Sequence, residues 1–154
     1  MDEIKQQFIK ECLALLNKRM YQIQKSIKSI EESLASETKS SAGDKHETGR
    51  AMLQLEREKA GFRLKEIEEM LQTFSRINFN RTSEENNKRV IIGSMVKTSG
   101  HTYFIAVSLG EIIINNLKIY CISPQSPIGK LLVGKTNKDI VSFQSSKFTI
   151  LEIW

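Results

Sequence analysis

The feature that most constrains this chain is a long helical pattern of apolar residues at its start. No Gly or Pro occurs before Gly43, and the steps between the apolar residues are three or four. These residues are Ile4, Phe8, Cys12, Leu16, Met20, Ile23, Ile27, Ile30 and Leu34. The later steps alternate between four and three, which is typical of the seam of a coiled coil. We therefore expect one long helix in this region.

The same pattern resumes after a polar stretch that runs from Ser36 to Gly43. Its apolar residues are Ala60, Leu64, Ile67, Leu71 and Phe74. Two long helices joined by a short polar turn fold back on each other as an antiparallel hairpin. At about 1.5 Å per residue, an arm of this kind is on the order of 50 Å long. We expect residues 1–77 to form an antiparallel coiled-coil hairpin with its tip near residues 43–48.

The remainder of the chain has a different pattern. Residues 78–89 are polar and aperiodic, and we interpret them as a linker. Short β-rich segments follow, with Gly and Asn residues between them as turn signals. These segments are Val90–Ile92, Met95–Lys97, Thr102–Ser108, Ile112–Ile114, Leu117–Ile122, Ile140–Phe143 and Phe148–Ile153. We therefore expect residues 90–154 to form a small, mostly antiparallel sheet.

One helical segment interrupts these strands. Ser126 is a good N-cap, Pro127 is a good first helical residue, and Gly134 is a good stop. The predicted fold class is therefore multidomain, with an α-helical hairpin followed by an α+β unit that contains one short helix.

This helix overlaps a match to the phosphate-binding loop expression GxxxxGK[ST], which spans residues 129–136. A true phosphate-binding loop follows a strand and precedes a helix, and its interior is a flexible loop. Here the interior residues are apolar helix formers, and the residues after Thr136 are typical of a turn and a strand. We interpret the match as a capped helix and not as a nucleotide site.

Charge and composition exclude several classes of protein. The net charge is +5, but residues 1–78 contain 14 Lys/Arg and 13 Asp/Glu, whereas residues 79–154 contain 9 and 5. No apolar run approaches the ~18 residues that span a bilayer, and the start of the chain does not resemble an export signal. We expect a cytoplasmic protein, most simply a monomer, that does not bind membranes.

The two cysteines do not predict a metal site. Cys12 and Cys121 lie 109 positions apart, and His46 and His101 are the only histidines that could join them. No pair of ligands has the spacing of a structural zinc site. We expect two buried thiols.

The predicted tip carries two carboxylates, Asp44 and Glu47, three residues apart. One interpretation is a capping box, with Asp44 as the N-cap and Glu47 at the third helical position. The other is that both acids lie on one face at the end of a rod and contribute oxygen ligands to a divalent metal held by something else. The two interpretations are compatible.

Basic residues of the hairpin are mostly interleaved with acidic ones, which is typical of a solvated helix face. Arg50 and Arg57, one heptad apart, could also contact a nucleic-acid backbone or an acidic partner. No aromatic residues are interleaved with them in a way that predicts base stacking. No Ser/His/Asp or Cys/His arrangement occurs, so we expect no self-contained active site and no cofactor of the chain's own.

Taken together, these features resemble the bacterial Gre transcript-cleavage factors. The tip and descending helix carry the resemblance in three segments, 43–47, 58–62 and 67–71. The C-terminal half carries it in segments 92–96, 122–135 and 150–153. The most specific segment contains Ser126, Pro127, Gly129, Gly134 and Lys135. The resemblance implies an FKBP-like C-terminal domain without isomerase activity.

The resemblance also implies a function in which this protein is not the enzyme. The C-terminal domain would dock on RNA polymerase, and the hairpin would enter the secondary channel. There Asp44 and Glu47 would help to hold a weakly bound Mg²⁺ shared with the polymerase, which hydrolyses backtracked RNA by two-metal chemistry.

The tip departs from the family pattern. Thr48 and Gly49 follow Glu47 where the family normally has Asn, and the distance to Gly61 and Phe62 is about two residues longer. Two extra residues rotate a helix by about 200°. Two alternatives therefore remain open: a channel-binding regulator that does not stimulate cleavage, and a coiled-coil adaptor unrelated to transcription.

Overall fold

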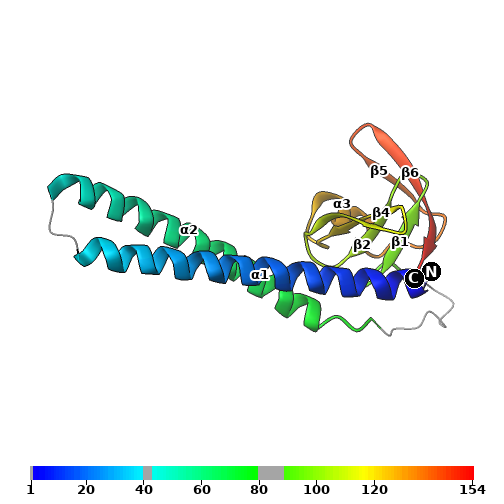
Figure 1. Ribbon diagram of the computed structural model, residues 1–154. Coiled ribbons are helices and arrows are strands. Elements are labelled where there is room, and N and C mark those ends of the chain that lie inside the picture. Colours follow the sequence, from blue (N-terminus) through cyan, green and yellow to red (C-terminus); the bar gives the residue numbers. More distant parts are fainter. Residues whose placement is uncertain (1, 40–42, 80–88) are drawn as a thin grey trace. The chain divides into compact units, whose positions relative to one another are not determined.

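The computed structural model describes residues 2–39, 43–79 and 89–154 (Figure 1). The chain divides into two compact units. One unit is Leu13–Leu71, and the other combines Met1–Cys12 with Gln72–Trp154. The predicted linker at 78–89 falls largely on residues 80–88, which lie outside the described residues.

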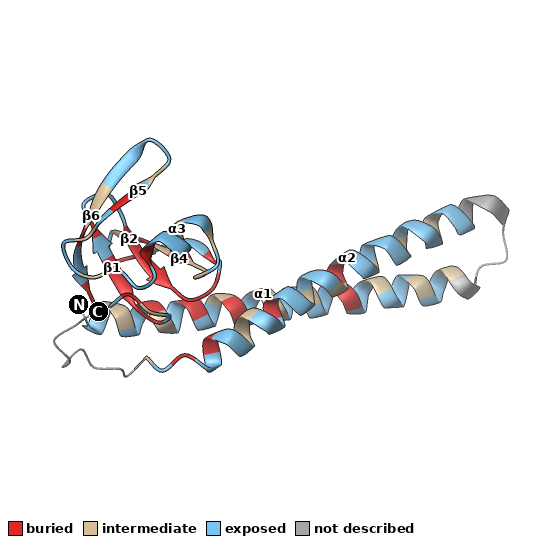
Figure 2. Ribbon diagram, turned by 180° about the vertical axis from the view of Figure 1, so that it is seen from behind, coloured by how far each residue is buried: buried red, intermediate tan, exposed pale blue. Residues whose placement is uncertain are grey.

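The unit Leu13–Leu71 is a helical hairpin made by the greater parts of α1 (Asp2–Lys39) and α2 (Gly43–Ser75). The two helices run side by side in opposite directions (Figures 1 and 2). Leu16 and Ile27 of α1 are buried, as are Ala60 and Ile67 of α2. The predicted coiled-coil seam is therefore correct, and its apolar residues hold the two helices together.

Both helices are longer than the polar composition of residues 36–43 indicated. α1 continues to Lys39 and α2 begins at Gly43, so the predicted turn is reduced to residues 40–42, which lie outside the described residues. No Pro occurs in residues 36–39, and the Ser36 hydroxyl donates to the Glu32 carbonyl oxygen one turn earlier, at 3.2 Å. Polar side chains on an exposed surface do not end a helix by themselves.

The second unit contains a six-stranded sheet with the order β3-β4-β2-β1-β6-β5. Its strands are β1 (Met95–Thr98), β2 (Thr102–Ile105), β3 (Gly110–Ile114), β4 (Leu117–Ile122), β5 (Ile140–Phe143) and β6 (Ser146–Ile153). The short helix α3 (Pro127–Leu132) lies between β4 and β5 in the sequence. The six strands and the helix are close to the sequence predictions.

The sheet is mostly antiparallel, as expected: four strand pairs are antiparallel, and β2 pairs with β4 in parallel. One detail of the predicted strands is wrong. Val90–Ile92 is not a strand: Arg89 makes an isolated bridge to Thr136, and the chain then turns. Hydrophobic runs of three residues cannot by themselves distinguish a strand from a buried connection.

Both faces of the central strands are covered, because side chains of successive residues point to opposite faces. All four residues of β2 are buried. Tyr103 and Ile105 pack in a core with Leu132 of α3. Phe104 lies between them in the sequence and contacts Phe8 of α1, with ring centroids 5.1 Å apart. The sheet therefore has α3 on one face and the first turns of α1 on the other.

Phe74, near the end of α2, completes the second covered face. Its ring centroid is 6.5 Å from that of Phe104 and 5.0 Å from that of Phe79. Phe8, Phe74 and Phe104 are each at most 1% exposed. The helix ends in residues 2–12 and 72–75 are therefore part of the core of the sheet unit, as Figure 2 shows by the buried segments there.

Candidate functional site

The acidic pair lies at the start of α2. The helix begins at Gly43, so Asp44 lies inside it. The capping interpretation required Asp44 to precede the helix as its N-cap, and it is therefore wrong. The side chain of Asp44 lies outside the described residues. Glu47 is exposed. A spacing of three residues on one continuous helix separates the two positions by about 60° around the axis, so they share a face.

Arg50 is exposed, whereas Arg57 is half-buried and paired. The Arg57 Nε–H donates to the Glu31 carboxylate across the hairpin, at 3.0 Å. Arg57 falls in the register of the α2 seam, three residues before Ala60 and four after Leu53. Its pairing with α1 therefore gives it a structural role, and Arg50 is the more available of the two for a partner.

Gly61 lies one turn after Arg57 on α2. A Cβ added to Gly61 would lie 3.1 Å from the Arg57 Nη1 atom, so the guanidinium crosses the helix surface where a side chain would otherwise stand. The absence of a side chain at residue 61 thus leaves room for the arginine that bridges to Glu31.

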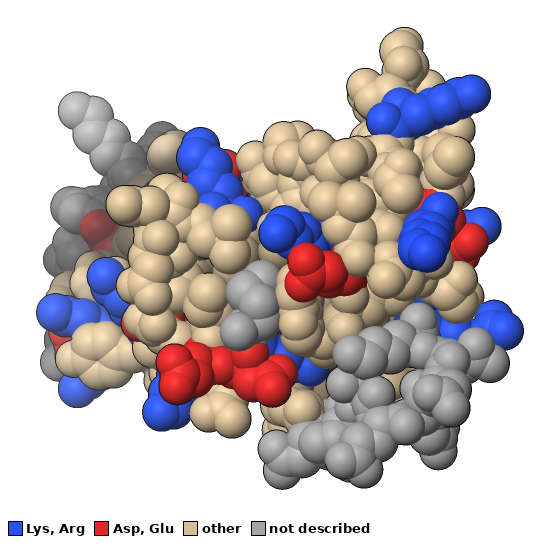
Figure 3. Space-filling model, turned by 90° about the vertical axis from the view of Figure 1, so that its right-hand side faces the viewer, with Lys and Arg blue, Asp and Glu red and all other residues tan. Residues whose placement is uncertain are grey.

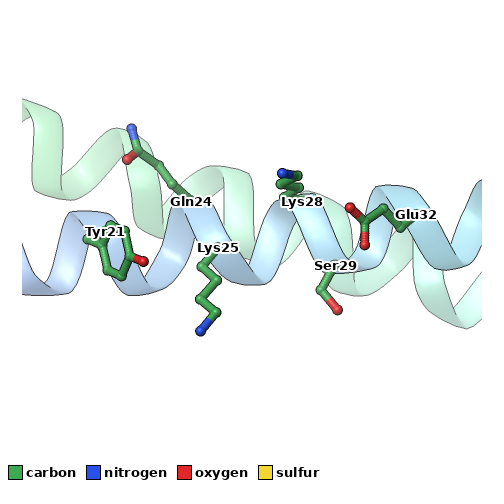
Figure 4. A pocket seen from close by; sticks show the side chains of 6 residues that line it. All are labelled: Tyr21, Gln24, Lys25, Lys28, Ser29 and Glu32. Atoms are coloured by element: carbon green, nitrogen blue, oxygen red, sulfur yellow. The ribbon is translucent and has the colours of Figure 1, made fainter.

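An exposed aromatic side chain on α1 was missed by the sequence analysis. Tyr21 is 65% exposed and, with Lys25 and Lys28, lines a shallow hollow of about 590 Å³. Gln24, Ser29 and Glu32 complete the lining, so every lining residue belongs to α1 (Figure 4). Tyr21 immediately follows the seam residue Met20, and that register was the signal that could have placed it on the surface.

The six side chains do not converge on a common point. In Figure 4, Lys25 and Ser29 point to one side of α1, whereas Gln24 points to the other. A surface of this kind can contact an extended, negatively charged partner through lysines and an aromatic face. It does not enclose a small molecule.

Phe62 of α2 is also strongly exposed, at 71%. It directly follows Gly61 and lies outside the seam that packs on α1. Met52 and Leu55 of the same helix are exposed as well. Single exposed apolar side chains are normal on a protein surface, so these three residues do not by themselves indicate a binding site.

In the sheet unit, the segment that contains Ser126, Pro127 and Gly129 forms a capped helix. The Ser126 hydroxyl accepts a hydrogen bond from the Gly129 N–H at 3.1 Å and donates to the Ser123 carbonyl oxygen at 2.7 Å. Pro127 is the first residue of α3, as predicted. A Cβ on Gly129 would collide with the Ser123 carbonyl oxygen. Ser126, Pro127 and Gly129 therefore build the turn before α3.

Gly134 and Lys135 lie just after the end of α3. Gly134 has a φ of +83°, which is the left-handed conformation that glycine adopts readily after a helix. The Lys135 carbonyl oxygen accepts from the Val90 N–H at 2.8 Å, and the Lys135 side chain is exposed. The interior of the GxxxxGK[ST] match is thus helical, which agrees with its interpretation as a capped helix.

Basic side chains are scattered over the face seen in Figure 3. Lys and Arg groups alternate there with uncharged surface and with acidic groups, and they do not gather into one patch. Within the described residues, no three or more His, Cys, Asp or Glu side chains come together as a metal site. No helix in the described part of the chain is long and apolar enough to cross a membrane.

No family model matches the sequence, and no curated protein matches it.

Proposed function

We propose that this chain is a Gre-type elongation factor that binds RNA polymerase, inserts its hairpin into the secondary channel and stimulates cleavage of backtracked RNA. The sheet unit is the docking domain and has an FKBP-like fold. Asp44 and Glu47 help to hold an Mg²⁺ shared with the polymerase. The polymerase supplies the active site, and this chain supplies none of its own.

The observation that carries the proposal is the place of Glu47. It is an exposed acid in the first turns of α2, three residues after Asp44, where the second helix of a long hairpin begins. Acidic side chains in the first turn of a helix favour the helix dipole, and at the end of a long hairpin they also suit delivery of carboxylate oxygens into a confined site. The motif at residues 126–135 supports the same family by resemblance.

The chemistry requires a partner because two carboxylates cannot satisfy Mg²⁺. The ion demands near-octahedral coordination by oxygen and keeps several waters. In two-metal hydrolysis one ion stabilises the attacking oxygen and the other the leaving oxygen. The tip acids would raise the occupancy of the weaker ion and accept a hydrogen bond from the attacking water, while polymerase residues supply the remaining ligands.

The alternative is a channel-binding regulator of transcription that does not stimulate cleavage. Thr48 and Gly49 favour it, because they follow Glu47 where the resembled family has Asn. Such a protein would occupy the same channel and alter initiation without shortening RNA.

The test uses polymerase complexes stalled in a backtracked state. We expect the wild-type protein to shorten the RNA 3′ end in the presence of Mg²⁺. The double variant Asp44→Ala/Glu47→Ala should bind polymerase as tightly as wild type and lose at least ten-fold in the cleavage rate.

The matched control is Glu66→Ala/Glu69→Ala. It removes the same two charges at the same spacing from exposed positions farther along α2, and it should cleave like wild type. Equal cleavage by the Asp44/Glu47 variant and wild type would disprove the metal role. If the protein binds polymerase and changes initiation without shortening the RNA, the regulator is the correct alternative. If it does not bind polymerase, a role in transcription is excluded.

A further inference from the structure

The two cysteines of the chain lie in one compact unit although they are 109 positions apart. Cys12 is on α1 and Cys121 is on β4, and both are free thiols that are at most 1% exposed. A buried cysteine is most often only a small apolar side chain. The position of these two relative to each other allows a more specific conclusion.

Neighbouring contacts place both cysteines in the same buried layer, between the first turns of α1 and the sheet. Cys12 lies one helical turn after Phe8, and the Phe8 ring packs against that of Phe104 at 5.1 Å. Phe104 is the parallel register partner of Cys121 on the adjacent strand. Register partners on adjacent strands point to the same face of a sheet, so Phe104 and Cys121 both face α1, and Cys12 lies about one helical turn along α1 from Phe8.

The two thiol groups interact. The Cys121 side chain chiefly raises the pKa of Cys12, and the Cys12 side chain chiefly lowers the pKa of Cys121. Backbone N–H groups of Val107 and Leu109 lower the pKa of Cys121 further, against the opposing effect of burial. Cys121 is therefore the better nucleophile of the two.

We propose that Cys12 and Cys121 are a redox pair that a peroxide converts into an intramolecular disulfide between α1 and β4. The Cys121 thiolate attacks one peroxide oxygen, the O–O bond breaks, and a sulfenic acid and water form. The Cys12 sulfur then attacks the Cys121 sulfur and expels a second water. Two thiols lose two electrons in total, and one hydrogen peroxide accepts them.

The disulfide has a structural consequence that does not depend on the proposed function. The first turns of α1 are held on the sheet by noncovalent packing around Phe8, and the bond would make that attachment covalent. It would close a loop of more than one hundred residues, and long loops give the largest constraint on the unfolded chain. Oxidation should therefore raise the thermal midpoint of this unit by several degrees.

The experiment treats the full-length reduced protein with a small excess of hydrogen peroxide at neutral pH. We expect a mass loss of about 2 Da from the two hydrogens, with no free thiol on alkylation after denaturation. Trypsin should then release peptide 11–18 joined to peptide 119–130, each of which contains one cysteine, and a reductant should separate them. Because burial limits access, we expect the reaction to be slow and to accelerate as pH rises.

Cys12→Ala and Cys121→Ala are the controls, since each keeps a small apolar side chain at the site. Circular dichroism should show both variants folded, and neither should lose 2 Da or gain thermal stability under peroxide. The proposal is overturned if the wild-type thiols both remain free, if the product is a disulfide-linked dimer, or if each cysteine oxidises alone with a gain of oxygen mass.

Discussion

Gly129 is packed against the turn before α3 too closely to accept a side chain, because a Cβ there would collide with the Ser123 carbonyl oxygen. Gly129→Ala should therefore lower the free energy of unfolding by about 1–3 kcal/mol, the usual cost of overpacking. Urea unfolding measures this change. Gly100→Ala is the control, since its nearest neighbour would be at an ordinary 3.9 Å, and we expect a change within about 0.5 kcal/mol. Equal effects of the two substitutions would contradict the close approach.

Asp139 stabilises the loop before β5 through its charge. Its carboxylate accepts from the Thr136 N–H at 2.7 Å and from the Thr136 hydroxyl at 3.1 Å. The Thr136 N–H chiefly holds the pKa of Asp139 below its ordinary value, with the charges of Lys135 and Arg89 adding to the effect. A carboxyl group with a lowered folded pKa stabilises the fold above its unfolded pKa, and that contribution is lost as the pH falls through the folded value.

We therefore expect Asp139→Asn to be less stable than wild type at pH 7 and to approach wild type below pH of about 4, where the carboxyl group protonates. Urea midpoints of both proteins at pH 7, 5 and 3 measure the difference. A difference that stays constant or grows toward pH 3 would be inconsistent with this role.

At the scale of elements, a polar pair joins the two helices of the hairpin beside its apolar seam. Arg57 and Glu31 are paired at 3.0 Å, with side chains 39% and 56% exposed. Ion pairs at this exposure are screened by water and contribute about 0.2–1 kcal/mol. The pair is therefore a modest contribution to stability, and it also limits how freely Arg57 can bind another partner.

A double-mutant cycle with Glu31→Ala and Arg57→Ala tests the pair. We expect the two substitutions to couple by about 0.2–1 kcal/mol at low salt. The coupling should shrink in 1 M NaCl, where charges a few ångströms apart are screened. Glu32→Ala with Arg57→Ala is the matched control and should be additive. A coupling energy of zero at low salt would show that the contact contributes nothing to the hairpin.

The elements were predictable to very different degrees. The spacing of Leu16, Ile27 and Ile67 in the seam, and the cap at Ser126, are local signals, and the structure confirms them. The parallel pairing of β2 with β4 was not predictable in this way, because each strand has the same alternation whichever direction its neighbour runs. The sequence did not indicate that Arg57 lies in the register of the seam, because sequence patterns place a charged residue on the surface.

At the scale of the whole molecule, the sheet depends on residues far from it in the sequence. Phe8 and Phe74 cover the face that carries Phe104, and the compact unit includes residues 1–12 and 72–154. We expect a fragment of residues 89–154 to expose this apolar face and to melt at a lower temperature than the same unit in the full chain. Binding of a hydrophobic dye and calorimetry of both proteins measure the effect.

The control for this prediction is full-length Phe104→Ala, which leaves the helix ends in place but removes the ring that they cover, at a cost of about 3–5 kcal/mol. If the fragment melts cooperatively at the full-length temperature without binding dye, the helix ends are not part of its core.

The candidate tip was predictable only as a position in the sequence. Asp44 and Glu47 were identified by type and spacing, and the structure places both residues within α2 with Glu47 exposed. Tyr21 was not identified, since a single aromatic residue outside the seam has no signal until the helix register is known. Its position beside Lys25 and Lys28 depends on which face of α1 is turned away from α2.

The sequence by itself determined the features that depend on neighbours within one or two helical turns. These are the long helices, their apolar seam, the six strand segments and the capped helix at residues 127–132. The tertiary structure alone decided which strands pair, which face of the sheet the helix ends cover, and that Cys12 and Cys121 are buried in one unit. The physical reason is range: periodicity and capping act between residues close in the chain, whereas strand order and the grouping of the two thiols arise from burial of surfaces that are distant in the chain.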